Sequence, residues 1–80
     1  MYYVYIIQSI NHHDQTYVGC TEELKKRLSN HNSGPTPHTA KFMPWELVAY
    51  IAFEDKTKAY DFEAFLKLGS GREFKKHRFL

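Results

Sequence analysis

The feature that most constrains this chain is an apolar run at its start, Tyr2–Gln8, built of β-branched and aromatic residues. Such residues favour a strand. Side chains alternate along a strand, so one face carries Tyr3, Tyr5 and Ile7 and the other carries Tyr2, Val4 and Ile6. Because both faces are apolar, we expect a central strand that is covered on both sides.

Two further strands are expected downstream. The polar stretch Asn11–Gln15 is typical of a turn, which makes Thr16–Val18 the return strand of a hairpin that ends at Gly19. A second long apolar run, Trp45–Phe53, predicts the third strand.

Capping residues and periodicity predict two helices. The first runs from about Glu22 to Asn32, with Thr21 as its N-cap and the acidic residues 22 and 23 in its first turn. The second opens at Thr57 and ends at Gly69.

Two segments remain between and after these elements. The stretch from Ser33 to Pro44 holds three prolines and is expected to be a surface loop. The stretch from Gly71 to Leu80 is expected to include a short basic helix, which Phe74 and Phe79 tie to the body.

The order of these elements predicts an α+β fold, in which helices flank a three-stranded, mainly antiparallel sheet. A length of 80 residues allows one hydrophobic core, so residues 1–80 are expected to form a single domain. No apolar run approaches the roughly 20 residues of a membrane span, and Met1 is not followed by the basic start of a signal peptide. We therefore expect a cytoplasmic protein with no membrane partner.

Charge is distributed unevenly along the chain. Residues 1–66 carry six basic and eight acidic side chains, net −2, whereas residues 67–80 carry five basic and one acidic, net +4. A basic tail can follow a phosphate backbone, and a solubilising surface is the alternative reading.

Both predicted helices carry charged residues in their apolar stripes. Arg27 and His31 lie at helical spacing from two leucines, and Glu63 lies among the apolar positions of the later helix. One interpretation is an Arg27–Glu63 ion pair beside a hydrogen-bonded imidazole. The other is a cleft holding a cation, a carboxylate, an imidazole and hairpin tyrosines, groups that suit phosphate chemistry.

Other reactive side chains give weaker signals. The five histidines show no zinc-ligand spacing. Cys20 precedes a helix N-terminus, where a thiolate is stabilised, but a small buried thiol is the favoured interpretation.

One ordered set of residues resembles the GIY-YIG nucleases, whose pattern begins on two hairpin strands. The set comprises Tyr3-Val4-Tyr5, Tyr17-Val18-Gly19, Arg27, His31 and Glu63. The chain looks most like small single-domain members related to the nuclease domain of the excinucleases. That further likeness rests on Thr21, Arg27, His31-Asn32, Gly34, Thr39, Pro44-Trp45 and Glu63.

The resemblance implies metal-dependent hydrolysis of nucleic-acid phosphodiesters, with DNA as the expected substrate. Glu63 would bind a single Mg²⁺ or Mn²⁺ ion, and Arg27 would stabilise the charged phosphate. Tyr5 and Tyr17 would position or activate water, and His31 would carry a proton or bind phosphate. The phosphate backbone would be held by Lys41, Arg72, Lys75 and Lys76.

An alternative function keeps the same fold. The Asn that larger members carry after the Glu is not found, and 80 residues are expected to leave no room for a separate DNA-binding domain. These departures favour a catalytically weak nucleic-acid-binding or protein-interaction module as the second hypothesis. In either case a partner protein could supply the targeting.

Overall fold

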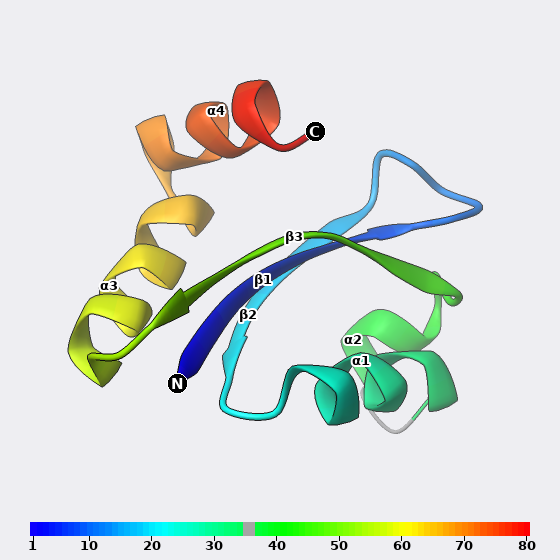
Figure 1. The fold of residues 1–80 in the computed structure, drawn as a ribbon. Helices are drawn as coiled ribbons and strands as arrows, with labels where there is room; N and C mark the ends of the chain where they lie inside the picture. The colour runs from blue at the N-terminus through cyan, green and yellow to red at the C-terminus, as the bar shows by residue number, and fades with distance from the viewer. Residues whose placement is uncertain (35–36) are drawn as a thin grey trace.

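Three antiparallel strands form the sheet on which the helices of this computed structural model pack (Figure 1). The structure describes residues 1–34 and 37–80. Its elements in chain order are β1 (Tyr2–Ser9), β2 (Thr16–Thr21), α1 (Leu24–Ser33), α2 (Pro37–Ala40), β3 (Trp45–Phe53), α3 (Lys56–Lys67) and α4 (Gly69–Arg78). The sheet order is β2-β1-β3. The predicted α+β class and the central place of the first strand are therefore confirmed.

Each face of the sheet is covered by a different layer. On one face, Val4 and Ile6 are buried against Ala59 and Leu66 of α3. On the other face, a second cluster of buried side chains packs against α1 and the segment that follows it. Its members include Tyr5, Ile7, Trp45, Leu24 and Leu28. The predicted alternation of β1 thus sorts its side chains into two separate cores.

Both helix starts differ from the prediction. α1 begins at Leu24, and Thr21 is the last residue of β2, where its hydroxyl accepts a 3.1 Å hydrogen bond from the backbone N–H of Glu23. Residues 22 and 23 therefore precede the helix. α3 begins before Thr57, because the Asp55 carboxylate accepts hydrogen bonds from the first backbone N–H groups of the helix.

The predicted loop between the first helix and the third strand is wrong in part. It contains α2, in which Thr39 is buried, and the indole Nε1–H of Trp45 donates a 2.7 Å hydrogen bond to the Thr39 carbonyl. The three-proline composition concealed a helical turn that tertiary packing holds in place. Two residues of this predicted loop, 35 and 36, lie outside the described part of the chain.

The predicted basic helix at the end of the chain is present as α4, and it starts earlier, at Gly69. Only Leu68 separates it from α3. The two helices pack tightly, since a β-carbon added at Gly71 would overlap the backbone carbonyl of Phe65. The Phe74 ring packs on Phe65, which confirms the expected attachment.

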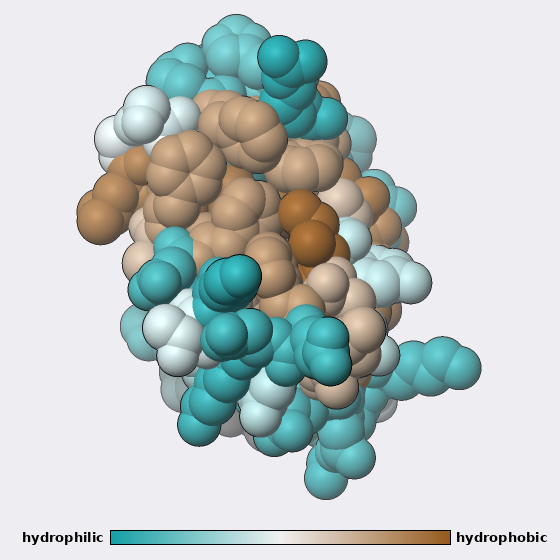
Figure 2. All heavy atoms as spheres, turned by 60° about the vertical axis from the view of Figure 1, so that its left-hand side comes forward, coloured by the Kyte–Doolittle hydropathy of each residue, from teal (hydrophilic) through white to brown (hydrophobic). Residues whose placement is uncertain are grey.

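Apolar side chains gather in one area when the side of the molecule that carries α3 and α4 is turned forward (Figure 2). Phe65, Leu68 and Phe74 are exposed residues of these two elements and the link between them. Among the described residues, no helix has the length and apolar character needed to cross a membrane.

Candidate functional site

The centre of the candidate site is the buried hydroxyl of Tyr5. In the pairing of β1 with β2, Tyr5 lies directly opposite Gly19. The Tyr5 side chain crosses the space above that glycine, and a β-carbon at Gly19 would overlap the phenol ring and its oxygen. The missing side chain at Gly19 is therefore what lets this ring, only 1% exposed, lie flat across β2.

His31 joins Tyr5 to the layer beneath the sheet. Its Nε2 lies 2.8 Å from the Tyr5 hydroxyl, and its Nδ1 lies 2.9 Å from Oγ1 of Thr39. The imidazole is 1% exposed, so both contacts are shielded from water. The sequence-based hypothesis of a hydrogen-bonded imidazole fits this geometry, and its suggested part in catalysis stays a prediction.

Two hydrogen-bonded contacts hold this layer together. The Asn32 side chain accepts a 2.6 Å hydrogen bond from the backbone N–H of Trp45 and donates a 2.9 Å one to its carbonyl. The Trp45 indole in turn holds the Thr39 carbonyl. The start of β3, the end of α1 and α2 are thereby fixed around His31.

Arg27, one turn before His31 on α1, sets the electrostatics of the buried pair. Burial raises the pKa of Tyr5 to about 12, while a hydrogen bond from Arg27 and its positive charge oppose that rise. Burial also lowers the pKa of His31, and the Arg27 charge acts in the same direction. At neutral pH the site therefore contains a neutral phenol and a neutral imidazole beside a guanidinium.

Glu63 and Lys67 approach from the opposite layer. The Lys67 ammonium lies 2.9 Å from Oε2 of Glu63, and the carboxylate side chain is 17% exposed. Lys67 also lies 5.9 Å from the centre of the Tyr17 ring. Glu63 thus pairs with Lys67 in the described structure, where no ion pair within 4 Å joins it to Arg27.

Tyr17 connects the two layers at β2, an edge strand of the sheet. Its ring centre lies 5.0 Å from that of His31 and 6.4 Å from that of Tyr5. The charges of Arg27 and Glu63 both act on Tyr5 and on Cys20 of the same strand. Five residues predicted for the site, Tyr5, Tyr17, Arg27, His31 and Glu63, therefore lie around β2.

Cys20 does not behave as a stabilised thiolate. Burial raises the pKa of its thiol, the negative charge of Glu63 raises it further, and Arg27 lowers it. The side chain packs against the core beneath α3. The favoured interpretation, a small buried thiol, is right only in part, because the Cys20 side chain is half-buried.

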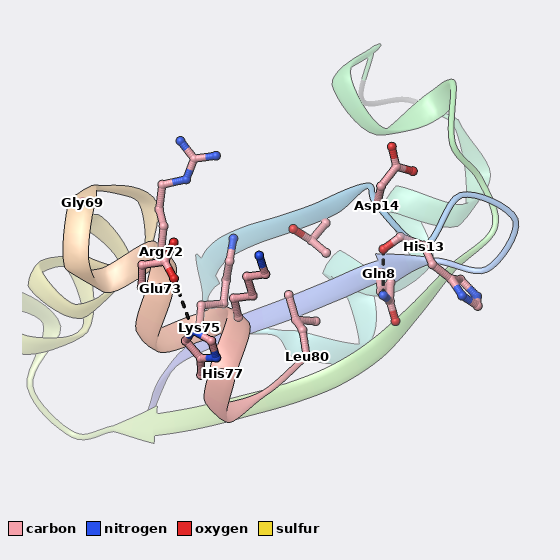
Figure 3. A pocket seen from close by; sticks show the side chains of 11 residues that line it. Gln8, His13, Asp14, Gly69, Arg72, Glu73, Lys75, His77 and Leu80 are labelled. Carbon is pink, nitrogen blue, oxygen red and sulfur yellow. Dashed lines mark hydrogen bonds and ion pairs between the residues drawn. The ribbon is translucent and has the colours of Figure 1, made fainter.

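A groove of about 910 Å³ extends from this edge between α4 and the turn that joins β1 to β2. Figure 3 shows Arg72 and Lys75 extending from α4 on one side, with Gln8 and Asp14 on the other. An adjoining hollow of about 370 Å³ shares Asp14, Arg72 and Lys75 with it and reaches Tyr17. The groove therefore leads into the site.

Three of the four predicted phosphate-binding residues, Arg72, Lys75 and Lys76, line this groove. Burial and the neighbouring Arg72 charge lower the pKa of Lys75, as expected where cations are crowded. Lys41 does not line the groove and directly follows α2, an element that lies apart from α4 (Figure 1).

The donor set available to a metal ion is small. Among the described residues, no three His, Cys, Asp or Glu side chains come close enough together to bind a metal ion. Glu63 is the one carboxylate among the predicted catalytic residues. Mg²⁺ keeps several waters and commonly takes one or two carboxylates together with substrate phosphate. A metal completed by its substrate fits Glu63, whereas an all-protein cage does not.

Two residues with direct contacts to the site were missed in the sequence. In the sequence, Thr39 contributes only to the family likeness, and Lys67 contributes only to the charge of the basic tail. The spacing of Lys67 four residues after Glu63 was a usable signal, because side chains at i and i+4 on a helix are neighbours. The contact between Thr39 and His31 had no local signal.

Comparisons with known proteins agree on one family. A model of the GIY-YIG catalytic domain matches residues 1–77. A UPF0213 protein of Streptococcus pyogenes is 37% identical over 67 residues, which is 81% of this chain and 70% of that protein. The solution NMR structure of a UPF0213 protein from Bacillus halodurans has a TM-score of 0.56 at 32% identity, covering 95% of this chain and 81% of that one.

A second group of relatives is larger. The structure-specific endonuclease subunit SLX1 of Podospora anserina is 38% identical over 69 residues, which is 79% of this chain and 20% of that protein. This chain therefore corresponds to about a fifth of that larger protein.

Proposed function

Because this chain belongs to the GIY-YIG family, as its sequence predicted, we propose that it is a metal-dependent endonuclease acting on nucleic-acid phosphodiester bonds, DNA foremost. The observation that carries the proposal is the convergence of two tyrosines, a guanidinium and a carboxylate around β2, from layers on opposite faces of the sheet. The name of the SLX1 relatives supports the same reaction class.

Arg27 supplies the positive charge that the reaction requires. Cleavage of a phosphodiester builds negative charge on the phosphoryl oxygens, and a guanidinium can donate two parallel hydrogen bonds to them. Arg27 is partly buried, so its charge acts in a medium less polar than water. We therefore assign it the role of stabilising the transition state.

Tyr5 and Tyr17 are assigned to the attacking water. The Tyr5 hydroxyl is held by His31, with the positive charge of Arg27 acting on it, and a fixed oxygen of this kind can orient a water molecule for in-line attack. The centre of the Tyr17 ring lies 6.4 Å from that of Tyr5 and 5.9 Å from the Lys67 ammonium. Positioning contributes most of the effect, because phosphoryl transfer needs alignment and charge neutralisation rather than a covalent intermediate.

Glu63 would hold the divalent ion, Mg²⁺ or Mn²⁺. When bound, such an ion polarises the phosphate and neutralises its charge. Lys67 occupies one oxygen of this carboxylate in the structure, so it also orients the side chain toward the edge of β2.

The groove beside α4 would hold the nucleic-acid backbone on its way to the site. Arg72, Lys75 and Lys76 place three positive charges along it, against Asp14 and Glu73. With so few cations, binding should be weak and steeply salt-dependent. Lys41, in the other layer, would contact only a substrate that spans both faces of the sheet.

The test is cleavage of labelled duplex DNA, single-stranded DNA, flap DNA and RNA at low salt with Mg²⁺ or Mn²⁺. We expect metal-dependent cutting by the wild-type protein and its loss in Glu63→Gln. Glu23→Gln is the matched control, because Glu23 is an exposed glutamate that also pairs with a lysine, Lys26, and it lines neither the groove nor the adjoining hollow. Intact substrates with the wild-type protein, or equal cutting by Glu63→Gln, would contradict the proposal.

The second candidate function is a nucleic-acid-binding module without efficient cleavage. The basic groove favours it, because that groove does not depend on Glu63. Binding that survives in Glu63→Gln with no cutting by the wild-type protein would select this alternative. A protein partner that targets the chain, and its cytoplasmic location, stay predictions.

A further inference from the structure

We propose that Thr39 is a positioning residue of this site, whose hydroxyl holds the His31 imidazole in the tautomer that accepts the proton of Tyr5. The assignment rests on the hydrogen bonds from Tyr5 to His31 and from His31 to Thr39. The tautomer stands independently of any reaction, while its effect on turnover rests on the proposed function.

The donor and acceptor roles follow from the groups around Tyr5. The Arg27 guanidinium carries only donors, and its positive charge acts on Tyr5, so it offers the phenol no acceptor. The phenol keeps its own proton at neutral pH because its pKa is about 12. Among the described residues, Nε2 of His31 is the acceptor within hydrogen-bond distance of that hydroxyl, so Tyr5 donates and Nε2 is unprotonated.

The position of the imidazole proton is then fixed. Burial and the Arg27 charge keep His31 neutral, and a neutral imidazole carries one proton. With Nε2 bare, that proton is on Nδ1, which lies 2.9 Å from the Thr39 oxygen. Thr39 therefore accepts from Nδ1–H, and the chain of donors runs from Tyr5 through His31 to Thr39.

Thr39 is well held for this task. Its side chain is 1% exposed, and its own carbonyl accepts the indole hydrogen bond of Trp45. The titratable groups that face the Tyr5–His31 pair from the neighbouring elements are Arg27, Tyr17 and Glu63. None of these three makes a hydrogen bond to Nδ1 in the described structure, so the tautomer depends on Thr39.

The tautomer decides which way protons move in the proposed hydrolysis. As the water oxygen bonds to phosphorus, one water proton passes to the Tyr5 oxygen and the phenolic proton passes to Nε2 of His31. The bond from phosphorus to the leaving oxygen breaks, and its electron pair stays on that oxygen. His31 ends as an imidazolium with protons on both nitrogens, and Thr39 still accepts from Nδ1.

Nitrogen-15 NMR of the histidine side chains tests the tautomer directly. The His31 signal is the one that disappears in His31→Gln, and the signals of the other four histidines, which are exposed, should remain unchanged. We expect a protonated Nδ1 and a bare Nε2 in the wild-type protein at neutral pH. A protonated Nε2 would overturn the proposal, whether or not any Thr39 variant folds.

Two variants then isolate the hydroxyl. Thr39→Val keeps the side-chain volume and removes the acceptor, and Thr39→Ser keeps the acceptor. We expect Thr39→Val to lose the defined Nδ1–H signal and Thr39→Ser to restore it. In cleavage assays kcat should fall about tenfold or more in Thr39→Val, equivalent to about 1.4 kcal/mol in the barrier, with KM nearly unchanged.

The two levels of failure are separable. If Glu63→Gln abolishes cleavage but Thr39→Val keeps the wild-type NMR signature and kcat, the Thr39 proposal is overturned and the nuclease assignment stands. If the tautomer and its loss in Thr39→Val are as expected but nothing cleaves, the positioning by Thr39 is supported and the proposed reaction fails.

Discussion

Replacing Gly19 by alanine adds one methyl group where β2 passes beneath the Tyr5 ring. The added β-carbon would lie within 3 Å of three Tyr5 atoms: the hydroxyl oxygen and two ring carbons. The ring cannot swing aside, because it is 1% exposed and its hydroxyl is bonded to His31. Either β2 or the ring must shift, and both movements displace the candidate catalytic hydroxyl.

Overpacking of a well-filled core costs about 1–3 kcal/mol. In a domain of this size, each kcal/mol lowers Tm by about 4–8 °C. Urea unfolding of the wild-type protein and Gly19→Ala measures the change. Cleavage should fall by a larger factor than the fraction of folded protein does, because the displaced oxygen belongs to the site.

A double-mutant cycle identifies the cause. Tyr5→Leu removes all three overlapping atoms, so Gly19→Ala should cost much less in that background, with a coupling energy of about 0.5–3 kcal/mol. If Gly19→Ala costs the same in both backgrounds, the overlap with Tyr5 is not the reason for the glycine.

Four other perturbations have defined outcomes. The pKa of Tyr5 is raised from 10.0 to about 12, so its contribution to the free energy of unfolding is fully present below pH 10 and is lost as the pH rises toward 12. Urea unfolding at stepped pH should therefore show a smaller loss of stability over this range in Tyr5→Phe than in the wild-type protein. The pKa of His31 is lowered from 6.5, so its contribution to the free energy of unfolding is present above pH 6.5 and is lost as the pH falls below that value. The same urea titrations should show that His31→Gln removes this loss of stability at low pH. Asn32→Ala removes both hydrogen bonds to the Trp45 backbone and should lower the free energy of unfolding by about 1–3 kcal/mol. Asn32→Asp keeps the acceptor and should lower it less. Equal losses in the two variants would show that these hydrogen bonds do not stabilise the fold. Asp55→Ala should cost about 1 kcal/mol by leaving N–H groups of α3 uncapped, Asp55→Ser should recover most of it in thermal melts, and no loss in the alanine variant would argue against the cap.

Apolar runs predicted the first and third strands, whereas the second was predicted only in part, because β2 continues past the predicted end at Gly19 to Thr21. The third strand matches the prediction at both ends, Trp45 and Phe53, and the two faces of β1 bury the side chains assigned to them. Such patterns carry this information because the two-residue period of a strand acts over its whole length.

Helix starts could not be predicted as well, because several neighbouring residues can cap a helix. Thr21 and Thr57 are both suitable N-caps by type, yet Thr21 lies in β2 and Asp55 accepts the hydrogen bonds at the start of α3. Which candidate caps the helix depends on where the preceding strand stops pairing, and that is set by tertiary contacts.

The candidate site was predictable as far as its residue types carry a pattern. Tyr5, Arg27 and Glu63 lie on separate elements, and only an ordered family motif could link them before the structure was known. Contacts such as that of His31 with Thr39 follow from the packing of α2 beneath the sheet. That segment is too short for a helical periodicity to be recognised, so its sequence alone could not predict the helix or its contact with His31.

The division of the site between two layers also has a consequence for synthesis of the chain. The site residues of the α1 layer and the hairpin all precede position 40, while Glu63 lies on α3, which packs on the opposite face. A nascent chain, or one in which α3 has opened locally, has the arginine and the tyrosines without the carboxylate. In the proposed nuclease, hydrolysis would thus begin only once the last layer has docked, which keeps incompletely folded copies harmless to the nucleic acid around them.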